Sequence, residues 1–255
     1  PMEDAPRRIG RIRKRALEEI ERSPELSIVK NRADWEQARR QGRIAVLFSL
    51  EGGEGAANLT ELKELYEFGV RMVNPVWNYP NALGFPALGT EDTGLTGYGG
   101  EVLEWMESVG MIVDVSHLSD AGIRDVAAMA RKPFIASHSD ARALMDHPRN
   151  IPDIYIRAVA ESGGVVGINT YGPHLGPGKD PWEAILAHIR HVYDAGGADC
   201  PAVGADFDGD PEMAVHDAGE MHRLPGLLAE AGFTAREVEK ILTGNAARIL
   251  EGVLR

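Results

Sequence analysis

The chain has 255 residues, of which 44% are hydrophobic and 26% charged, which is typical of a globular protein with one large α/β domain or two small ones. Its net charge of -12 argues against a nucleic acid as partner, because binding to phosphates needs a basic face. The single cysteine, Cys200, excludes an intramolecular disulfide and a cysteine-rich zinc site.

Short apolar runs alternate along the chain with amphipathic segments of helix length. After a charged opening helix over residues 9–20, the predicted strands are 44–50, 72–77, 111–115, 133–136, 164–169 and 201–205. The predicted helices between and after them are 59–68, 99–108, 120–131, 152–161, 181–195, 218–231, 235–242 and 245–254. The strand runs are rich in Val and Ile and nearly unbroken, as expected of parallel strands covered on both faces.

The alternation predicts one βα domain over residues 1–255. Six strands are too few for a closed (β/α)8 barrel, so either the sheet is open and doubly wound or two strands lie upstream of Pro1. No apolar run reaches the roughly 18–20 residues of a membrane span, and we expect no membrane segment and a cytoplasmic location.

Candidate catalytic residues follow the predicted strands, where βα folds collect their working groups. Glu51, His117, His138 and Asp206 each stand directly after such a run. Imidazole and carboxylate groups are the ligands of hydrolytic zinc, and their recurrence predicts a metal site. A metal lowers the pKa of its bound water from about 15.7 to about 7, and a carboxylate, Asp206 or Asp208, would then carry the proton to the leaving amine.

Six segments, in this order, resemble the membrane dipeptidase (renal dipeptidase) family of the metal-dependent amidohydrolase superfamily. They are Leu-Glu-Gly-Gly-Glu at 50–54, Asp-Val-Ser-His-Leu-Ser at 114–119, Ala-Ser-His-Ser with Ala-Arg at 136–142, His-Pro-Arg-Asn at 147–150, Gly-Gly-Val-Val-Gly-Ile-Asn at 163–169 and Gly-Ala-Asp-Phe-Asp-Gly at 204–209. The similarity extends from about Ile9 to the last predicted helix.

The resemblance implies a TIM-like (β/α)8 barrel with a binuclear zinc centre that hydrolyses dipeptides. By this likeness, Glu51 would bridge both metals, and His117 and His138 would complete the shell of the second metal. Asp206 would be the catalytic acid and base.

The same resemblance assigns the substrate. Arg149 would pair with the carboxylate of the dipeptide, for which a guanidinium fork is well shaped, and Tyr171 would line the pocket. Many members place a histidine that holds the tetrahedral intermediate where this chain has Trp77, which leaves the group that stabilises the oxyanion open. Members are often dimers, so a homodimer is possible.

One departure from the family concerns the first metal. The family's opening strand carries a His-x-Asp pair, whereas this chain has no histidine before His117. By the family's layout, we expect the six strands to correspond to the third to eighth of a barrel, with the first two absent from this sequence, and one full zinc ligand set is visible instead of two. The alternatives are a related metal hydrolase acting on a lactone or cyclic amide, and an inactive fragment or relative that lacks the first metal site.

Other reactive side chains have structural interpretations. Cys200 opens an apolar strand and is expected to behave as a small buried hydrophobe. His188 and His191 lie three apart on a predicted helix, and we expect them on a solvated face.

Overall fold

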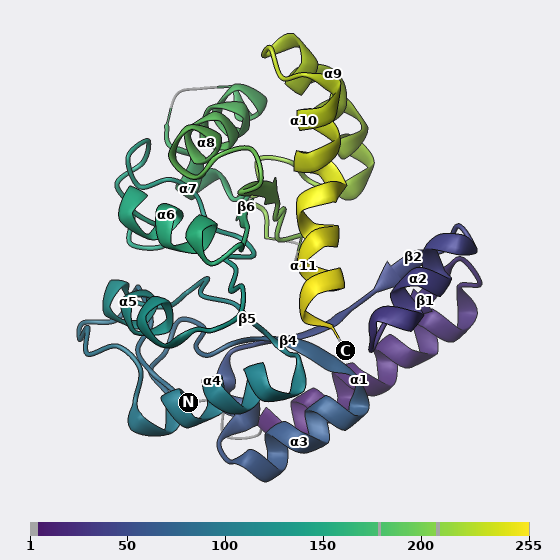
Figure 1. Ribbon diagram of the computed structural model, residues 1–255, viewed down its shortest axis with the longest axis vertical. Helices are drawn as coiled ribbons and strands as arrows, with labels where there is room; N and C mark the ends of the chain where they lie inside the picture. Colours follow the sequence, from purple (N-terminus) through teal and green to yellow (C-terminus); the bar gives the residue numbers. More distant parts are fainter. Residues whose placement is uncertain (1–4, 178–179, 208–209, 255) are drawn as a thin grey trace. The chain divides into compact units, whose positions relative to one another are not determined.

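The computed structural model describes residues 5–177, 180–207 and 210–254 of a mixed α/β protein (Figure 1). The chain separates into two compact units: Pro1–Met129 with Leu250–Arg255, and Ala130–Ile249. The single incomplete barrel domain expected over residues 1–255 stays a prediction.

The first unit contains two parallel sheets. In one, β1 (Leu26–Ile28) pairs with β2 (Ile44–Val46), and in the other the order is β3 (Phe48–Glu51), β4 (Val70–Asn74) and β5 (Ile112–Val113). The helices of this unit are α1 (Ala5–Arg22), α2 (Arg32–Arg40), η1 (Gly53–Ala56), α3 (Leu59–Phe68), α4 (Gly97–Val109) and α5 (Asp120–Met129).

The second unit contains the parallel pair β6 (Val166–Ile168) and β7 (Pro201–Val203). Its helical segments are α6 (Asp153–Glu161), α7 (Gly172–Leu175), α8 (Pro181–Gly196), η2 (Ala218–Arg223), α9 (Leu224–Glu230), α10 (Ala235–Glu239) and the π-helical turn η3 (Lys240–Gly244). The last helix, α11 (Asn245–Val253), begins in this unit. No helix in these described ranges is long and apolar enough to cross a membrane.

Helix starts follow from side chains that accept hydrogen bonds from otherwise unpaired backbone N–H groups. A capping box lies at Thr234, whose hydroxyl accepts from the N–H of Glu237 while the Glu237 carboxylate accepts from the N–H of Thr234. At α3 the side chain of Asn58 accepts from the N–H groups of Thr60 and Glu61. These caps fix where the helices begin and therefore how long the preceding strand-end loops are.

Buried apolar side chains hold the strands in place. Each unit has its own apolar core, with Leu62, Val73 and Met106 fully buried in the first and Ile156 and Val166 in the second. Each such side chain contributes roughly 1.5–3 kcal/mol by leaving water. This packing holds the strands, and with them the loops that carry the polar residues.

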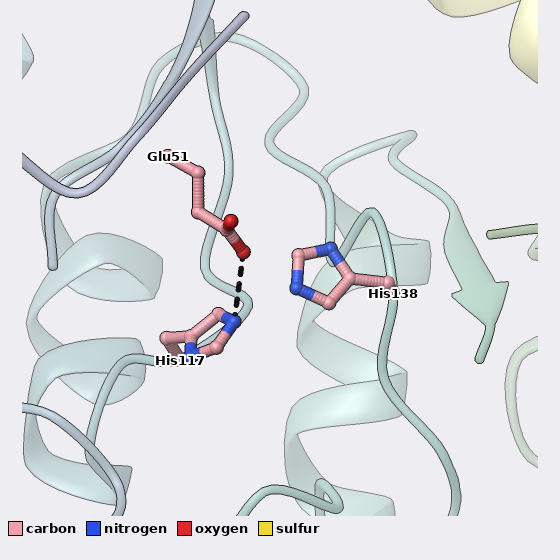
Figure 2. A group of neighbouring side chains, drawn as sticks. All are labelled: Glu51, His117 and His138. Atoms are coloured by element: carbon pink, nitrogen blue, oxygen red, sulfur yellow. Dashed lines mark ion pairs between the residues drawn. The ribbon is translucent and has the colours of Figure 1, made fainter. Parts of the chain in front are cut away.

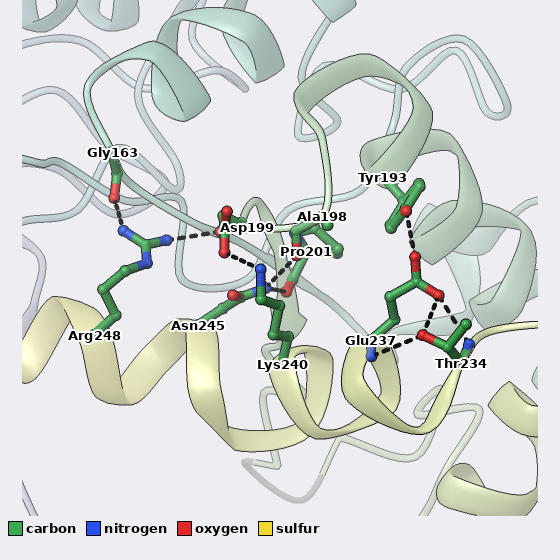
Figure 3. A network of polar contacts seen from close by, with 10 residues as sticks. All are labelled: Gly163, Tyr193, Ala198, Asp199, Pro201, Thr234, Glu237, Lys240, Asn245 and Arg248. Carbon is green, nitrogen blue, oxygen red and sulfur yellow. Dashed lines mark hydrogen bonds and ion pairs between the residues drawn. The ribbon is translucent and has the colours of Figure 1, made fainter.

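Contacts from the C-terminal helix region support β7 (Figure 3). The side chain of Asn245 donates to the carbonyl of Pro201 at 2.8 Å, and Arg248 donates to the carbonyls of Gly163 and Asp199. These bonds tie the starts of the two strands of the second unit to one helix.

The predicted order of strands is confirmed with two corrections. The strand expected over 133–136 was wrong: only isolated bridges form there, at Ile135 and at Ala136, and Ala136 pairs in parallel with Val166. Pro133 has no N–H with which to extend the ladder. The run 44–50 is divided at Leu47 into β2 and β3, which pair with different strands. The short β1 and the charged helix α2 were not predicted.

Candidate metal centre

Glu51 ends β3, and the chain turns away immediately after it. Gly52 adopts a φ of 88°, a conformation that favours glycine, and the N–H of Gly53 donates to the carbonyl of Pro75 at 3.1 Å. A Cβ on Gly53 would overlap Leu83 and the carbonyl oxygen of Pro75. The two glycines thus permit a close turn that leaves the Glu51 side chain 42% exposed at the strand end.

His117 lies in the loop after β5 and is held from its backbone. Its φ of 71° is left-handed, which a non-glycine residue adopts only when its surroundings enforce it. The carbonyl oxygen of His117 accepts from the N–H of Ala87 at 2.7 Å, and the N–H of Leu118 donates to the carbonyl of Val115. The ring is consequently fixed and almost buried, with 6% of the residue exposed.

The His117 ring lies between two oxygen atoms. Its Nε2 is 2.9 Å from Oε1 of Glu51 (Figure 2). Its Nδ1 is 2.9 Å from Oδ1 of Asn78. Because the amide oxygen of Asn78 only accepts, a neutral ring carries its hydrogen on Nδ1 and turns an unprotonated Nε2 toward a carboxylate. Two acceptors face each other favourably only when a proton or a metal cation lies with them. The donor set of imidazole nitrogen and carboxylate oxygen therefore fits zinc.

His138 belongs to the second unit and is also contacted at Nδ1. The hydroxyl oxygen of Ser137 lies 2.7 Å from that atom, and the N–H of Ser139 donates to the carbonyl of Gly167 at 2.8 Å. A Cβ on Gly167 or on Gly204 would overlap the carbonyl oxygen of Ser137. Gly167 in the middle of β6 and Gly204 directly after β7 thus let the backbone at Ser137 approach closely.

Asp206 follows β7 with a left-handed φ of 63°. Its Oδ2 accepts a hydrogen bond from Nδ2 of Asn169 at 3.1 Å, and Oδ1 of Asn169 accepts from the N–H of Tyr171 at 2.7 Å. The fully buried Asn169 therefore orients the carboxylate, a role that the sequence analysis missed although this residue ends a predicted strand. Asp208, the other acid considered there, lies outside the described residues.

Arg149 is 4% exposed and lies in a loop that side chains hold in place. The N–H of Arg149 donates to Nδ1 of His147, and the Asn150 amide donates to the carbonyls of Met145 and His174, each at 2.9 Å. Burial, together with the charges of nearby arginines, lowers the pKa of His147, which keeps its ring neutral and able to accept. The loop therefore fixes the backbone from which the guanidinium of Arg149 extends.

A buried acid, Asp140, was also missed. It is fully buried, and this burial raises its pKa well above the usual range. The backbone N–H of Asn169 and the positive charge of Arg149 act in the opposite direction. Both carboxyl oxygens of Asp140 are buried without a hydrogen-bond partner in the described part of the chain, which is costly for a charged group, and no local sequence pattern predicted this burial.

Two predicted substrate residues lie on exposed or partly exposed loops. Trp77 is 38% exposed in the loop after β4 and not at the strand end, because β4 stops at Asn74. The hydroxyl of Tyr171 donates to Oε2 of Glu212 at 2.7 Å, and its ring lies edge-on to the ring of His174.

The remaining predictions have mixed outcomes. The solvated face expected for His188 was wrong: it is 1% exposed, its Nδ1 accepts from the N–H of Ala141, and its Nε2 faces the carbonyl of Leu175. This face of α8 packs inward, and the ring supplies hydrogen bonds to the loop after His138. Burial of Cys200 is confirmed, and it raises the pKa of the thiol to about 12, far from that of a nucleophile.

Comparison with known proteins matches nearly the whole chain. The family model of the membrane dipeptidases (peptidase family M19) covers residues 11–254. A Klebsiella pneumoniae protein named "Uncharacterized protein in pqqA 5'region" is 34% identical over 239 residues, which are 87% of this chain and 86% of that protein.

Solved structures show the same similarity. The dipeptidase AC, a metallopeptidase of family M19, is 28% identical with a TM-score of 0.82 over 91% of this chain and 72% of its own. A metallopeptidase from Rhodobacter sphaeroides, liganded with a phosphinate mimic of the dipeptide L-Ala-D-Ala, is 26% identical with a TM-score of 0.83 over 91% and 70%. An amidohydrolase from Pseudomonas aeruginosa shares the fold with a TM-score of 0.87 at 24% identity over 95% and 83%. The predicted fold class, an α/β protein of the TIM-barrel type found in metal-dependent hydrolases, is confirmed.

Proposed function

Since the chain belongs to the membrane dipeptidase family, peptidase family M19, it is a metal-dependent dipeptidase, and we propose that its metal is zinc and that it hydrolyses the peptide bond of dipeptides with a metal-activated water. The observation that carries this proposal is the contact between Glu51 and Nε2 of His117, with Asn78 on the opposite ring nitrogen. This is the arrangement of a histidine prepared to bind a metal.

The proposed ligands are Glu51, His117 and His138. Both histidines have an oxygen atom beside Nδ1, from Asn78 in one and from Ser137 in the other, so that Nε2 is the nitrogen left for the ion. When bound, zinc would polarise the carbonyl of the substrate and lower the pKa of its water to about 7. A second ion, which the family resemblance implies, would share Glu51.

Asp206 is the proposed acid and base. The amide of Asn169 binds its Oδ2 and orients the carboxylate, so that Oδ1 would take the proton from the attacking water and pass it to the leaving amine. The left-handed backbone of Asp206 suits this role, because strained residues are concentrated at functional sites.

The substrate would be held by its carboxylate. The guanidinium of Arg149 is the proposed partner, since a planar fork of donors matches a carboxylate and its loop is fixed by His147 and Asn150. Trp77 and Tyr171 are proposed to line the pocket. The possible homodimer stays a prediction.

The experiment is to remove bound metal with a chelator, restore zinc, and measure both zinc content and the hydrolysis of a series of dipeptides. We expect activity to follow zinc content. Glu51→Gln and His117→Ala should each lower kcat/KM by at least about 100-fold and reduce bound zinc, because each removes a ligand. The matched controls are Glu64→Gln and His222→Ala, which alter exposed residues on α3 and η2. Full zinc content and turnover in both ligand variants would contradict the proposal.

A further inference from the structure

Three consecutive residues in the loop after β4, Trp77, Asn78 and Tyr79, differ in burial. Asn78 is half-buried and turns its amide oxygen to Nδ1 of His117 at 2.9 Å. Its neighbours on either side, Trp77 and Tyr79, are 38% and 56% exposed. One short segment thus contacts the candidate metal ligand and also presents two large aromatic rings to solvent.

The two rings form a fixed surface. Their centroids are 5.8 Å apart at an interplanar angle of 62°, close to the edge-to-face arrangement that aromatic pairs prefer. The Trp77 ring also lies 6.4 Å from the His117 ring, tilted by 45°. Because Asn78 is hydrogen-bonded to His117, the segment cannot swing away without breaking that contact.

Exposed aromatic surface beside a polar centre is typical of a ligand site. Such sites combine apolar and aromatic walls with a few polar groups that set orientation. Here the polar groups are Glu51 and His117, and the aromatic surface belongs to the same loop as Asn78, which orients the histidine.

We propose that Trp77 and Tyr79 bind the side chain of the first residue of the dipeptide, and that this enzyme prefers dipeptides beginning with an aromatic or branched aliphatic residue. The inference rests on the proposed function. The carbonyl that the metal would polarise belongs to the first residue, so the side chain of that residue is the one nearest to the ligands. Apolar side chains gain most from this surface, since Trp and Tyr each offer about 150–250 Å² of largely apolar contact area.

The test compares kcat/KM for Phe-Ala, Leu-Ala, Lys-Ala and Gly-Ala in the zinc-loaded enzyme. We expect Phe-Ala and Leu-Ala to be preferred over Gly-Ala, and Tyr79→Ala and Trp77→Ala each to reduce this ratio by about tenfold, mainly through KM. The matched control is Ile44→Ala, which removes a side chain 60% exposed on β2 of the same unit and should leave the ratio unchanged.

A second measurement does not depend on turnover. Titration of the zinc-free protein with Phe-Ala should change the tryptophan fluorescence in a saturable way, and Trp77→Phe should abolish the change while the other tryptophans remain. Gly-Ala should give a much weaker response.

The outcomes separate the two proposals. An unchanged ratio in both alanine variants, or a preference for Lys-Ala over Phe-Ala, would overturn the aromatic surface as an apolar subsite while the dipeptidase proposal stands. No turnover of any of the four dipeptides by the zinc-loaded wild-type enzyme would overturn the proposed function, and the subsite with it.

Discussion

In the first unit the Glu51 carboxylate is 42% exposed and meets the His117 ring at 2.9 Å, whereas in the second unit the Asp140 carboxyl group is fully buried and Arg149 is 4% exposed. A half-exposed carboxylate keeps much of its hydration and can exchange water for an ion at little cost. A buried carboxyl group has already lost its water, which is why the pKa of Asp140 is raised. The first arrangement is suited to receiving a ligand, and the second to holding the protein's own groups in place.

The contacts around Glu51 and around Asp140 also differ. Around Glu51 and His117, the supporting contacts include a glycine turn, the N–H of Ala87 on the His117 carbonyl and the amide oxygen of Asn78. Around Asp140, the neighbouring backbone is bound by the buried His188 ring, and its own carbonyl accepts from the N–H of Ile151 at 2.8 Å. We therefore expect changes near the first pair to alter metal binding first, and changes near the second to alter folding first.

The largest effect should come from Gly204→Ala in the second unit. Its Cβ would overlap the carbonyl oxygen of Ser137 and the backbone of Gly167, neither of which can move alone. We expect the free energy of unfolding to fall by about 3 kcal/mol, measured by urea denaturation followed by circular dichroism. The control is Gly226→Ala in α9, where a Cβ meets nothing within 4 Å. Because alanine has the higher helix propensity, this change should raise the free energy of unfolding by at most about 1 kcal/mol. Equal stability of Gly204→Ala and wild type would contradict the expectation that close packing in the second unit governs folding.

A smaller and different effect is expected in the first unit from Asn78→Ala. Loss of the oxygen that fixes Nδ1 of His117 should weaken zinc binding by about 10–100-fold, measured by competition with a chelator. The free energy of unfolding should change by less than about 1 kcal/mol, since Asn78 is only half-buried. Asn78→Asp keeps an acceptor at this position and should retain most of the affinity. Wild-type zinc affinity in Asn78→Ala would show that the contact has no part in metal binding.

The sequence was sufficient for the parts of the site that depend on chain order. Parallel strands deliver residues to their carboxyl ends, and periodicity located the strand ends near Glu51, His117 and Asp206 to within a few residues. The roles of these three residues stay predictions. A capping box such as that at Thr234 can also be recognised in a sequence, because it is a local pattern.

The features that the sequence did not predict depend on tertiary contacts. Nothing local distinguishes Asp140 from an exposed aspartate, and its burial arises only when its loop meets Asn169 and Arg149. The same holds for His188, whose inward face is set by packing of α8. The left-handed backbone of His117 could not be predicted either: histidine is enriched in this conformation among non-glycine residues, but it adopts it too rarely for the sequence to mark the position.

The smallest predicted effect concerns a partly exposed contact of the second unit, which tests whether stability effects in this unit depend on burial. The Tyr193 hydroxyl donates to the Glu237 carboxylate, which also accepts from the N–H and hydroxyl of Thr234 (Figure 3). These bonds, that of Tyr193 first, lower the pKa of Glu237 from 4.5 to about 2. A pKa lowered in the folded state adds stability above the unfolded value, and this stability is lost as the pH falls from about 4.5 toward about 2.

Tyr193→Phe should therefore lower the melting temperature slightly at pH 7, and the difference from wild type should shrink as the pH falls through that window. Thermal unfolding followed by circular dichroism at a series of pH values measures it. Tyr98→Phe is the control, because the Tyr98 hydroxyl donates to the backbone carbonyl of Ala56, which does not titrate. The loss of melting temperature in Tyr98→Phe should therefore persist at low pH. A Tyr193→Phe deficit that stays constant from pH 7 to pH 2 would mean that the ionised Glu237 does not contribute. If the difference in melting temperature between Tyr193→Phe and wild type vanishes at low pH as expected, the contact stabilises the second unit only while Glu237 is ionised. The buried groups of this unit would then differ from it, because they stabilise the fold through packing.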